Sequence, residues 1–156
     1  MKKILASFVL ASGLAALLMA QKTPTVASGI PESELPDVVV NGFKGYKTGG
    51  YTVATAAWAR DSALLLDPLP LPALKTYLSL AGDNAGQFVG ADAVQVVKLS
   101  NNTEEVYAVA KFERQAVYFA FTCYKVNEKW IITVINANKD PAVVLPTAMM
   151  GSLPNS

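Results

Sequence analysis

The C-terminal half of the chain consists of runs rich in apolar residues, which are separated by short polar breaks. A period of two residues is typical of half-buried strands, because successive side chains of a strand point to opposite faces of a sheet. The breaks fall at residues 101–103, 113–114 and 127–128. Such short connections join antiparallel neighbours. The pattern therefore predicts an antiparallel meander of four strands, over residues 92–100, 104–113, 115–126 and 130–137.

Two-residue loops at 113–114 and 127–128 fix which residues lie opposite each other. The first loop pairs Ala108 with Phe119, and the second pairs Cys123 with Ile132 and Phe121 with Val134. One face is then wholly apolar, and we expect it to pack under helices: Val106, Ala108, Ala110, Val117, Phe119, Phe121, Cys123, Ile132 and Val134. The other face is amphipathic and carries Tyr107, Val109, Lys111, Tyr118, Ala120, Thr122, Tyr124, Thr133 and Ile135.

A helix is predicted between residues 43 and 66, where apolar side chains recur near a period of about 3.6 residues. The alanines between 54 and 59 favour a helix over a strand, although residues 51–57 also fit an alternating strand. Gly49 and Gly50 each oppose the helix by about 1 kcal/mol. A second helix is predicted from about Pro72 to Gly90, with an apolar stripe of Leu74, Leu78, Ala81, Ala85 and Phe88.

Helices followed by a meander define an α+β domain, with the helices on one face of the sheet. We assign this domain to residues 43–140. Prolines mark the flanking segments: residues 21–42 are expected to form an extended leader, in which 38–40 add a short strand or a packing contact, and 67–72 are expected to be polyproline-like. In the tail, residues 141–156, apolar side chains are expected to cover a hydrophobic seam: Leu145, Met149 and Met150.

The N-terminus combines Lys2 and Lys3 with an apolar run over residues 4–20. This is the pattern of a bacterial secretory signal, and the run is marginal for a membrane span of about 20 residues. We predict a signal peptide over residues 1–20, with cleavage after Ala20 and a second candidate site after Ala27. The mature protein would be periplasmic or secreted, with no stable membrane insertion, and an uncleaved anchor is the alternative.

The amino-acid composition excludes several classes of function and of catalytic site. The chain is 52% hydrophobic and 16% charged, with a formal net charge of +1, so it offers no basic patch for nucleic acid. It contains no histidine and a single cysteine, which excludes a Ser-His-Asp triad, an internal disulfide and a zinc site of the usual kind. We expect no metal and no other cofactor. Cys123 has no activating neighbour in sequence, so we expect it to be buried and unreactive.

Two stretches resemble the nuclear transport factor 2-like superfamily, a cone-shaped α+β fold that also includes ketosteroid isomerase and polyketide cyclases. The first is FKGYKTGGYTVATAAW over residues 43–58, and the second is the hairpin over 116–132, with YFAFTCYK leading through NEK to Trp130. The resemblance covers residues 43–140 and is greatest to small uncharacterised exported bacterial members. It implies helices packed on a curved, cone-like sheet. Enzymes of the superfamily place Asp, Tyr or a His-Asp pair inside the cone, and here only Asp92 starts a predicted strand, so we assign no catalytic residue.

Large side chains of the predicted cone are candidates to line a ligand pocket: Trp58, Asp61, Phe88, Phe112, Phe119, Phe121 and Trp130. The simpler interpretation is that the aromatic residues fill the core. The second sheet face predicts a homodimer, with ordinary cross-strand packing as the alternative, through Tyr107, Val109, Tyr118, Tyr124 and Ile135. We expect a non-enzymatic exported module that binds a small apolar ligand or a protein partner. The alternative is an isomerase, lyase or hydrolase that uses Asp and Tyr in the cone.

Overall fold

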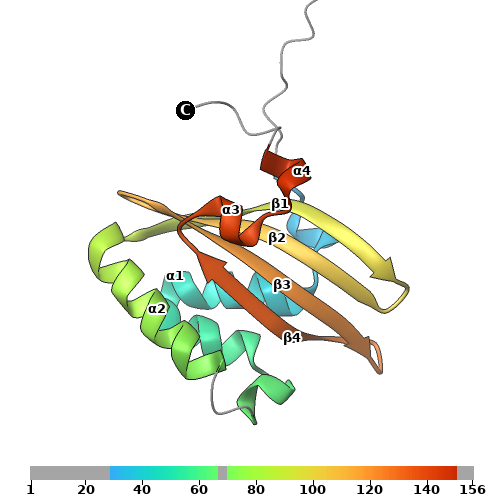
Figure 1. Cartoon of the computed structure of the whole chain (residues 1–156). Helices are drawn as coiled ribbons and strands as arrows, with labels where there is room; N and C mark the ends of the chain where they lie inside the picture. Colours follow the sequence, from blue (N-terminus) through green and yellow to red (C-terminus); the bar gives the residue numbers. More distant parts are fainter. Residues whose placement is uncertain (1–28, 67–69, 151–156) are drawn as a thin grey trace, which may run out of the picture.

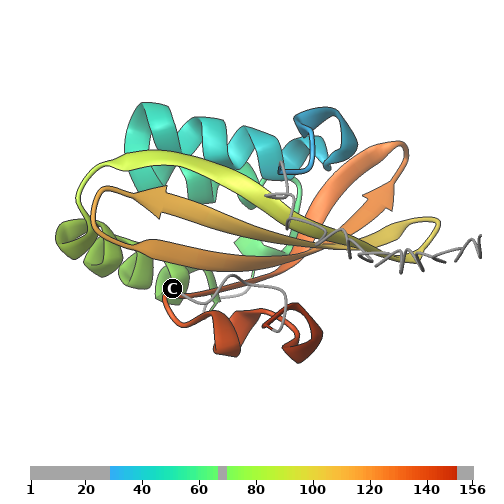
Figure 2. The same cartoon turned by 90° about the horizontal axis from the view of Figure 1, so that it is seen from above.

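The computed structural model describes residues 29–66 and 70–150. Helices precede a four-stranded antiparallel sheet that is curved and unclosed, which confirms the predicted α+β class (Figure 1). Helix α1 (Asp37–Trp58) lies on one side of the sheet, and the short helices α3 (Pro141–Val144) and α4 (Thr147–Met150) lie on the other (Figure 2). The predicted signal peptide and both candidate cleavage sites lie outside the described residues.

The sheet has the order β1-β2-β3-β4, with neighbours in sequence also neighbours in space. All four predicted strands are present: β1 (Phe88–Ser100), β2 (Thr103–Phe112), β3 (Ala116–Val126) and β4 (Lys129–Asn138). The register predicted for the first hairpin is confirmed, since Ala108 lies opposite Phe119. The β1–β2 ladder is irregular at three places: between Phe88 and Gly90, between Ala93 and Gln95, and between Lys98 and Ser100.

The second hairpin follows its predicted register only as far as Cys123, which lies opposite Ile132. The pairing of Phe121 with Val134 is wrong, because a register shift next to Cys123 places Phe121 opposite Ile135. Thr133 is the extra residue of this bulge, and its hydroxyl donates a hydrogen bond to the carbonyl of Thr122 at 3.2 Å. Val134 is therefore 43% exposed, while Ile135 packs against the helix-covered core.

Helix α1 starts earlier than predicted. Its first turn follows Pro36, and the Asp37 carboxylate accepts a hydrogen bond from the Val38 amide at 3.0 Å. Residues 37–42 are thus helical, which corrects the extended leader predicted over 21–42. Of the two predictions for residues 38–40, the short strand is wrong and the packing contact is confirmed, since Val38, Val39 and Val40 are buried within a helix and this packing outweighs their intrinsic preference.

The helix predicted over 43–66 is confirmed as far as Trp58, but it is not a single continuous helix, because a sharp reversal divides α1. The backbone leaves helical geometry at Gly49 and Gly50, where Gly50 has a φ of 66° that favours glycine. Beyond the reversal the helix ends at Trp58, and a short 3₁₀ turn, η2 (Ala63–Leu65), follows.

The two segments of α1 pack antiparallel against each other, as Figure 1 shows. Gly42 faces Trp58, and Gly45 faces Val53. A Cβ atom on Gly42 would lie 1.7 Å from Nε1 of Trp58, so only glycine allows this approach. The same Nε1 donates a hydrogen bond to the carbonyl of Val39 at 3.2 Å, which ties the segments together.

Helix α2 (Pro70–Ala85) starts two residues before the predicted Pro72, and so residues 70–72 are helical rather than polyproline-like. Proline is tolerated here because the first turn of a helix needs no amide hydrogen bond. The apolar stripe predicted for α2 is confirmed as far as the helix extends, with Leu74, Leu78, Ala81 and Ala85 buried. The predicted end at Gly90 is wrong: Gly86, with a φ of 81°, stops the helix, and Phe88 already belongs to β1.

The main core lies between the sheet and helices α1 and α2. Trp58, Phe119 and Phe121 are fully buried there, and the ring of Phe43 meets each of them edge-on at 5.2 to 5.8 Å. Cys123 is fully buried in the same core, as predicted. A second, smaller cluster lies on the opposite face, where Leu145 and Met149 cover Tyr107. The interpretation that the tail covers an apolar seam is therefore confirmed.

Within residues 29–66 and 70–150, no helix has the length and apolar character needed to cross a membrane.

Candidate functional site

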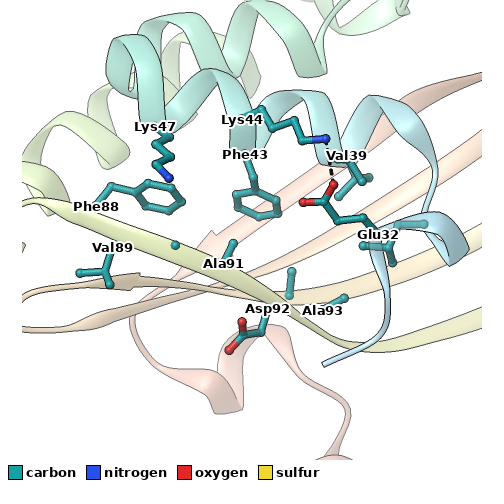
Figure 3. Close-up of a pocket in the computed structure, with 14 residues that line it drawn as sticks. Glu32, Val39, Phe43, Lys44, Lys47, Phe88, Val89, Ala91, Asp92 and Ala93 are labelled. Carbon is teal, nitrogen blue, oxygen red and sulfur yellow. Dashed lines mark ion pairs between the residues drawn. The ribbon is translucent and has the colours of Figure 1, made fainter. Parts of the chain in front are cut away.

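A groove of about 240 Å³ lies between the first segment of α1 and the edge strand β1 (Figure 3). The helix side is formed by one stripe, because residues three, four and seven positions apart share a helix face. That stripe comprises Val39, Val40, Phe43, Lys44 and Lys47. The ring of Phe43 points from the helix toward the strand, so that an aromatic face forms part of the floor.

The strand side of the groove is lined by small residues, namely Gly90, Ala91 and Ala93. Their short side chains leave the space into which Phe43 points (Figure 3). Phe88 closes one end of the floor. At the other end, the amide of Ile30 donates a hydrogen bond to the carbonyl of Ala93 at 3.3 Å. The groove is therefore short and bounded, with a floor that is apolar at its centre.

Some of the charged side chains around the groove are paired with an opposite charge, and one is not. Nζ of Lys44 lies 2.8 Å from a carboxylate oxygen of Glu32. The carboxylate of Asp92 points away from the groove and is held by Lys111 at 2.8 Å (Figure 3). Lys47 extends from α1 toward Phe88, and across residues 29–66 and 70–150 it takes part in no ion pair. One positive charge is thus left unneutralised beside the apolar floor.

The seven predicted pocket residues are not brought together. Trp58, Phe119 and Phe121 fill the core, as the simpler interpretation expected. Only Phe88 lines the α1–β1 groove. The remaining candidates lie in two other surface hollows: Phe112 beside Phe88 and Tyr46, and Asp61 with Trp130 and Arg60.

The predicted dimer face is partly occupied by the chain itself. Tyr107 is only 7% exposed because the tail covers it, and Tyr118 packs against the same cluster. Val109 is half-buried, and Tyr124 is 42% exposed. Ile135 belongs to the opposite side of the sheet because of the bulge at Thr133. Homodimerisation stays a prediction, and the uncovered apolar area available for it is smaller than the sequence implied.

Three proton-donating groups are held in their neutral form by burial. Burial raises the pKa of Cys123 to about 12, and the carboxylate of Glu104 adds to the shift. Burial likewise raises the pKa of Tyr107 to about 12, assisted by a hydrogen bond of 2.7 Å that its hydroxyl donates to Glu105. Burial also raises the pKa of Tyr46 to about 12, with a contribution from Tyr51. None of these groups is poised to exchange a proton near neutral pH.

Sequence reasoning missed the residues that shape the groove. Lys44 and Lys47 were not singled out, although their spacing from Phe43 places all three on one helix face once the helix is known. Ala91 fell between the predicted end of the second helix at Gly90 and the predicted start of the first strand at Asp92, so its place in an edge strand was not recognised. In the part of the chain that the structure describes, no group of three or more His, Cys, Asp or Glu side chains is close enough to hold a metal ion.

No family model matches the chain, and no curated protein or solved structure matches it. The resemblance to the nuclear transport factor 2-like superfamily stays a prediction.

Proposed function

We propose that the protein is an exported, non-enzymatic binding module that holds a small ligand with an apolar body in the α1–β1 groove. One observation carries this proposal: a bounded groove with an aromatic floor stays open beside a core whose aromatic residues are otherwise packed. Burying apolar area contributes about 25 cal/mol per Å². A ligand that covers Phe43 and Phe88 would gain this energy on surfaces that the fold leaves half-buried.

The size of the groove favours a small ligand over a protein partner. A stable protein interface buries about 800 Å² on each partner, which extends well beyond this short hollow. Sites for drug-sized ligands span roughly 300–1,000 Å³, whereas this groove measures about 240 Å³. A ligand of roughly eight non-hydrogen atoms fits this space, at about 30 Å³ for each water-sized group.

The charged groups of the groove support binding rather than catalysis. A general acid or base must lie within hydrogen-bond reach of the reacting atom of the ligand. Both carboxylates that line the groove, Glu32 and Asp92, are paired with lysines. The alternative, an enzyme that uses Asp and Tyr, would have to use a different hollow, such as the one in which Asp83 lies with Tyr46 and Tyr51. Chemical conversion of a bound ligand by the purified protein would favour that alternative.

Titration with 1-octanol, followed by amide NMR shifts, tests the binding site. We expect saturable shifts at Phe43, Ala91 and their neighbours. Ala91→Leu adds a branched side chain to the groove floor and should weaken binding at least about ten-fold, the loss expected when about 1.4 kcal/mol of contact is removed. Ala73→Leu is the matched control, because it makes the same change on the exposed surface of α2. The proposal fails if octanol produces no saturable shifts, or if Ala91→Leu binds as the wild type does.

A further inference from the structure

The two ends of the α1–β1 groove differ in charge. At one end Lys44 is neutralised by Glu32, with 2.8 Å between Nζ and the carboxylate oxygen. At the other end Lys47 projects toward Phe88, and none of the described carboxylates pairs with it. In Figure 3 the Glu32–Lys44 pair and Lys47 flank the ring of Phe43 on opposite sides. A ligand lying on this ring therefore meets a net positive charge at only one of its ends.

We propose that the groove selects an amphipathic monocarboxylate, with its carboxylate at Lys47 and its apolar body on Phe43. This inference rests on the proposed function, since it names the ligand class for the same site. A carboxylate at Lys47 would neutralise a charge that the fold leaves unpaired. The Glu32–Lys44 pair at the opposite end carries no net charge to attract that carboxylate, so the ligand is expected to lie with its carboxylate toward Lys47.

The spacing of the two contacts sets the size of the ligand. Phe43 and Lys47 are four residues apart on one helix, which separates their positions by about 6 Å along the helix axis. A carboxylate at Lys47 therefore leaves an apolar chain directly over the ring of Phe43. The cavity volume of about 240 Å³ corresponds to roughly eight water-sized groups. Octanoate, with an apolar chain of seven carbons behind its carboxylate, is a probe of the right length.

Cationic and neutral ligands of the same length should bind less well. An ammonium group would meet Lys47 at one end, while the carboxylates of Glu32 and Asp92 are already held by lysines. A neutral hydroxyl would gain the apolar contacts without the charge pair. Because Lys47 is exposed, its contribution is modest: an exposed charge pair changes an affinity by about three- to five-fold.

The experiment compares three probes with one apolar tail: octanoate, 1-octanol and octylammonium, each titrated into the full chain at neutral pH and about 0.01 M salt. We expect octanoate to bind about three- to five-fold more tightly than octanol, and octylammonium to bind most weakly. Lys47→Gln should abolish the preference for octanoate and leave octanol binding unchanged. Lys98→Gln is the matched control, because it removes an exposed lysine of β1 that does not line the groove. Raising the salt to about 1 M should also reduce the preference, since it screens exposed charges.

The possible failures separate the two proposals. If octanol and octanoate bind the wild type equally and Lys47→Gln changes neither, the groove binds apolar ligands but the assignment of an anionic group is overturned. If neither probe causes saturable shifts at the groove, the proposed function itself is overturned. Unchanged thermal unfolding of Lys47→Gln confirms that any loss of octanoate binding arises at the site.

Discussion

The two faces of the sheet are covered by different means. On the α1 face, Trp58 and Phe119 are fully buried with ring centroids 5.4 Å apart, and Phe121 stacks on Phe119 at 5.5 Å. On the other face, two helices of four residues each place Leu145 and Met149 over Tyr107. Large interlocked rings lose many contacts when one is removed, whereas a short flap loses few. The comparison indicates that the first face determines whether the chain folds, and that the second mainly keeps a tyrosine-rich surface out of water.

The strongest test of this difference is Phe119→Ala, which removes a ring from the centre of the main core. A cavity among Phe43, Trp58 and Phe121 should lower the free energy of unfolding by about 3–5 kcal/mol. Urea unfolding measures this loss. A loss below about 1 kcal/mol would show that the aromatic cluster is not the main source of stability.

A second comparison uses the proton-donating group that each face buries. Cys123 on the α1 face and Tyr107 on the tail face both have a pKa raised to about 12, from ordinary values of 9.0 and 10.0. Above those ordinary values the unfolded chain releases these protons while the folded chain keeps them. Stability is therefore fully present below about pH 9 and falls as the pH rises toward 12, by up to about 1.4 kcal/mol per pH unit for each group.

Denaturant unfolding at pH 8, 10 and 11 distinguishes the two contributions. Cys123→Ala should remove the part of the decline that begins near pH 9, and Tyr107→Phe should reduce the part that begins near pH 10, to which Tyr46 also contributes. Equal alkaline declines in the wild type and both variants would contradict the assignment. At pH 8 a thiol reagent should modify Cys123 only as fast as the protein unfolds, because the buried thiol is protonated and shielded.

Weakening the tail should have a smaller effect on stability and a larger one on association. Leu145→Ala should lower the free energy of unfolding by about 2 kcal/mol, the low end for a buried leucine, and the sheet should remain folded.

Removing residues 141–156 should expose Tyr107 and Tyr118 together and promote self-association, which light scattering detects. If the shortened chain stays monomeric at concentrations where the full chain does, the covered face has no tendency to form a dimer.

The smallest expected effect distinguishes two neighbouring residues of β4. Val134→Ala should change the free energy of unfolding by less than about 0.5 kcal/mol, because Val134 is 43% exposed. Ile132→Ala should cost about 2–5 kcal/mol, because Ile132 is fully buried. Similar losses of unfolding free energy for the two variants would contradict the bulge and support the unbulged register, in which both side chains face the core.

The β2–β3 hairpin was predictable because a two-residue loop fixes which residues of the two strands lie opposite each other. The bulge in β4 was not, since Val134 and Ile135 are both apolar and the pattern does not show which of them faces the core. Packing decides the matter: Ile135 lies with the main core, and the extra residue is Thr133.

The reversal in α1 was visible in the sequence only in part. Gly49 and Gly50 were recognised as unfavourable for a helix. Two adjacent glycines are compatible both with a weakened helix and with a turn, so they did not reveal the reversal. The sharper indication was the series Gly42, Gly45 and Gly49, whose spacing of three and four residues places a bare stripe on one helix face. Trp58 and Val53 pack on that stripe.

The groove itself could not be predicted from local patterns. It depends on Phe43 and Lys47 lying across from Ala91, more than 40 residues later in the chain. Gly90 and Ala91 are visible in the sequence as small residues, but the predicted helix ended at Gly90 and the predicted strand began at Asp92, so neither was placed inside an edge strand. The periodicity of apolar residues within a segment does not show which distant segments pack against each other.

The irregular edge of β1 has a consequence for the behaviour of the protein at high concentration. A flat, regular edge strand offers its free backbone groups to any other chain and can nucleate aggregation. The ladder of β1 is regular only over Gly90–Ala93 and again over Gln95–Lys98. Each stretch is shorter than the roughly six-residue segments that stack into amyloid-like fibrils. The bulges that bend β1 alongside α1 therefore also make this edge a poor template for aggregation.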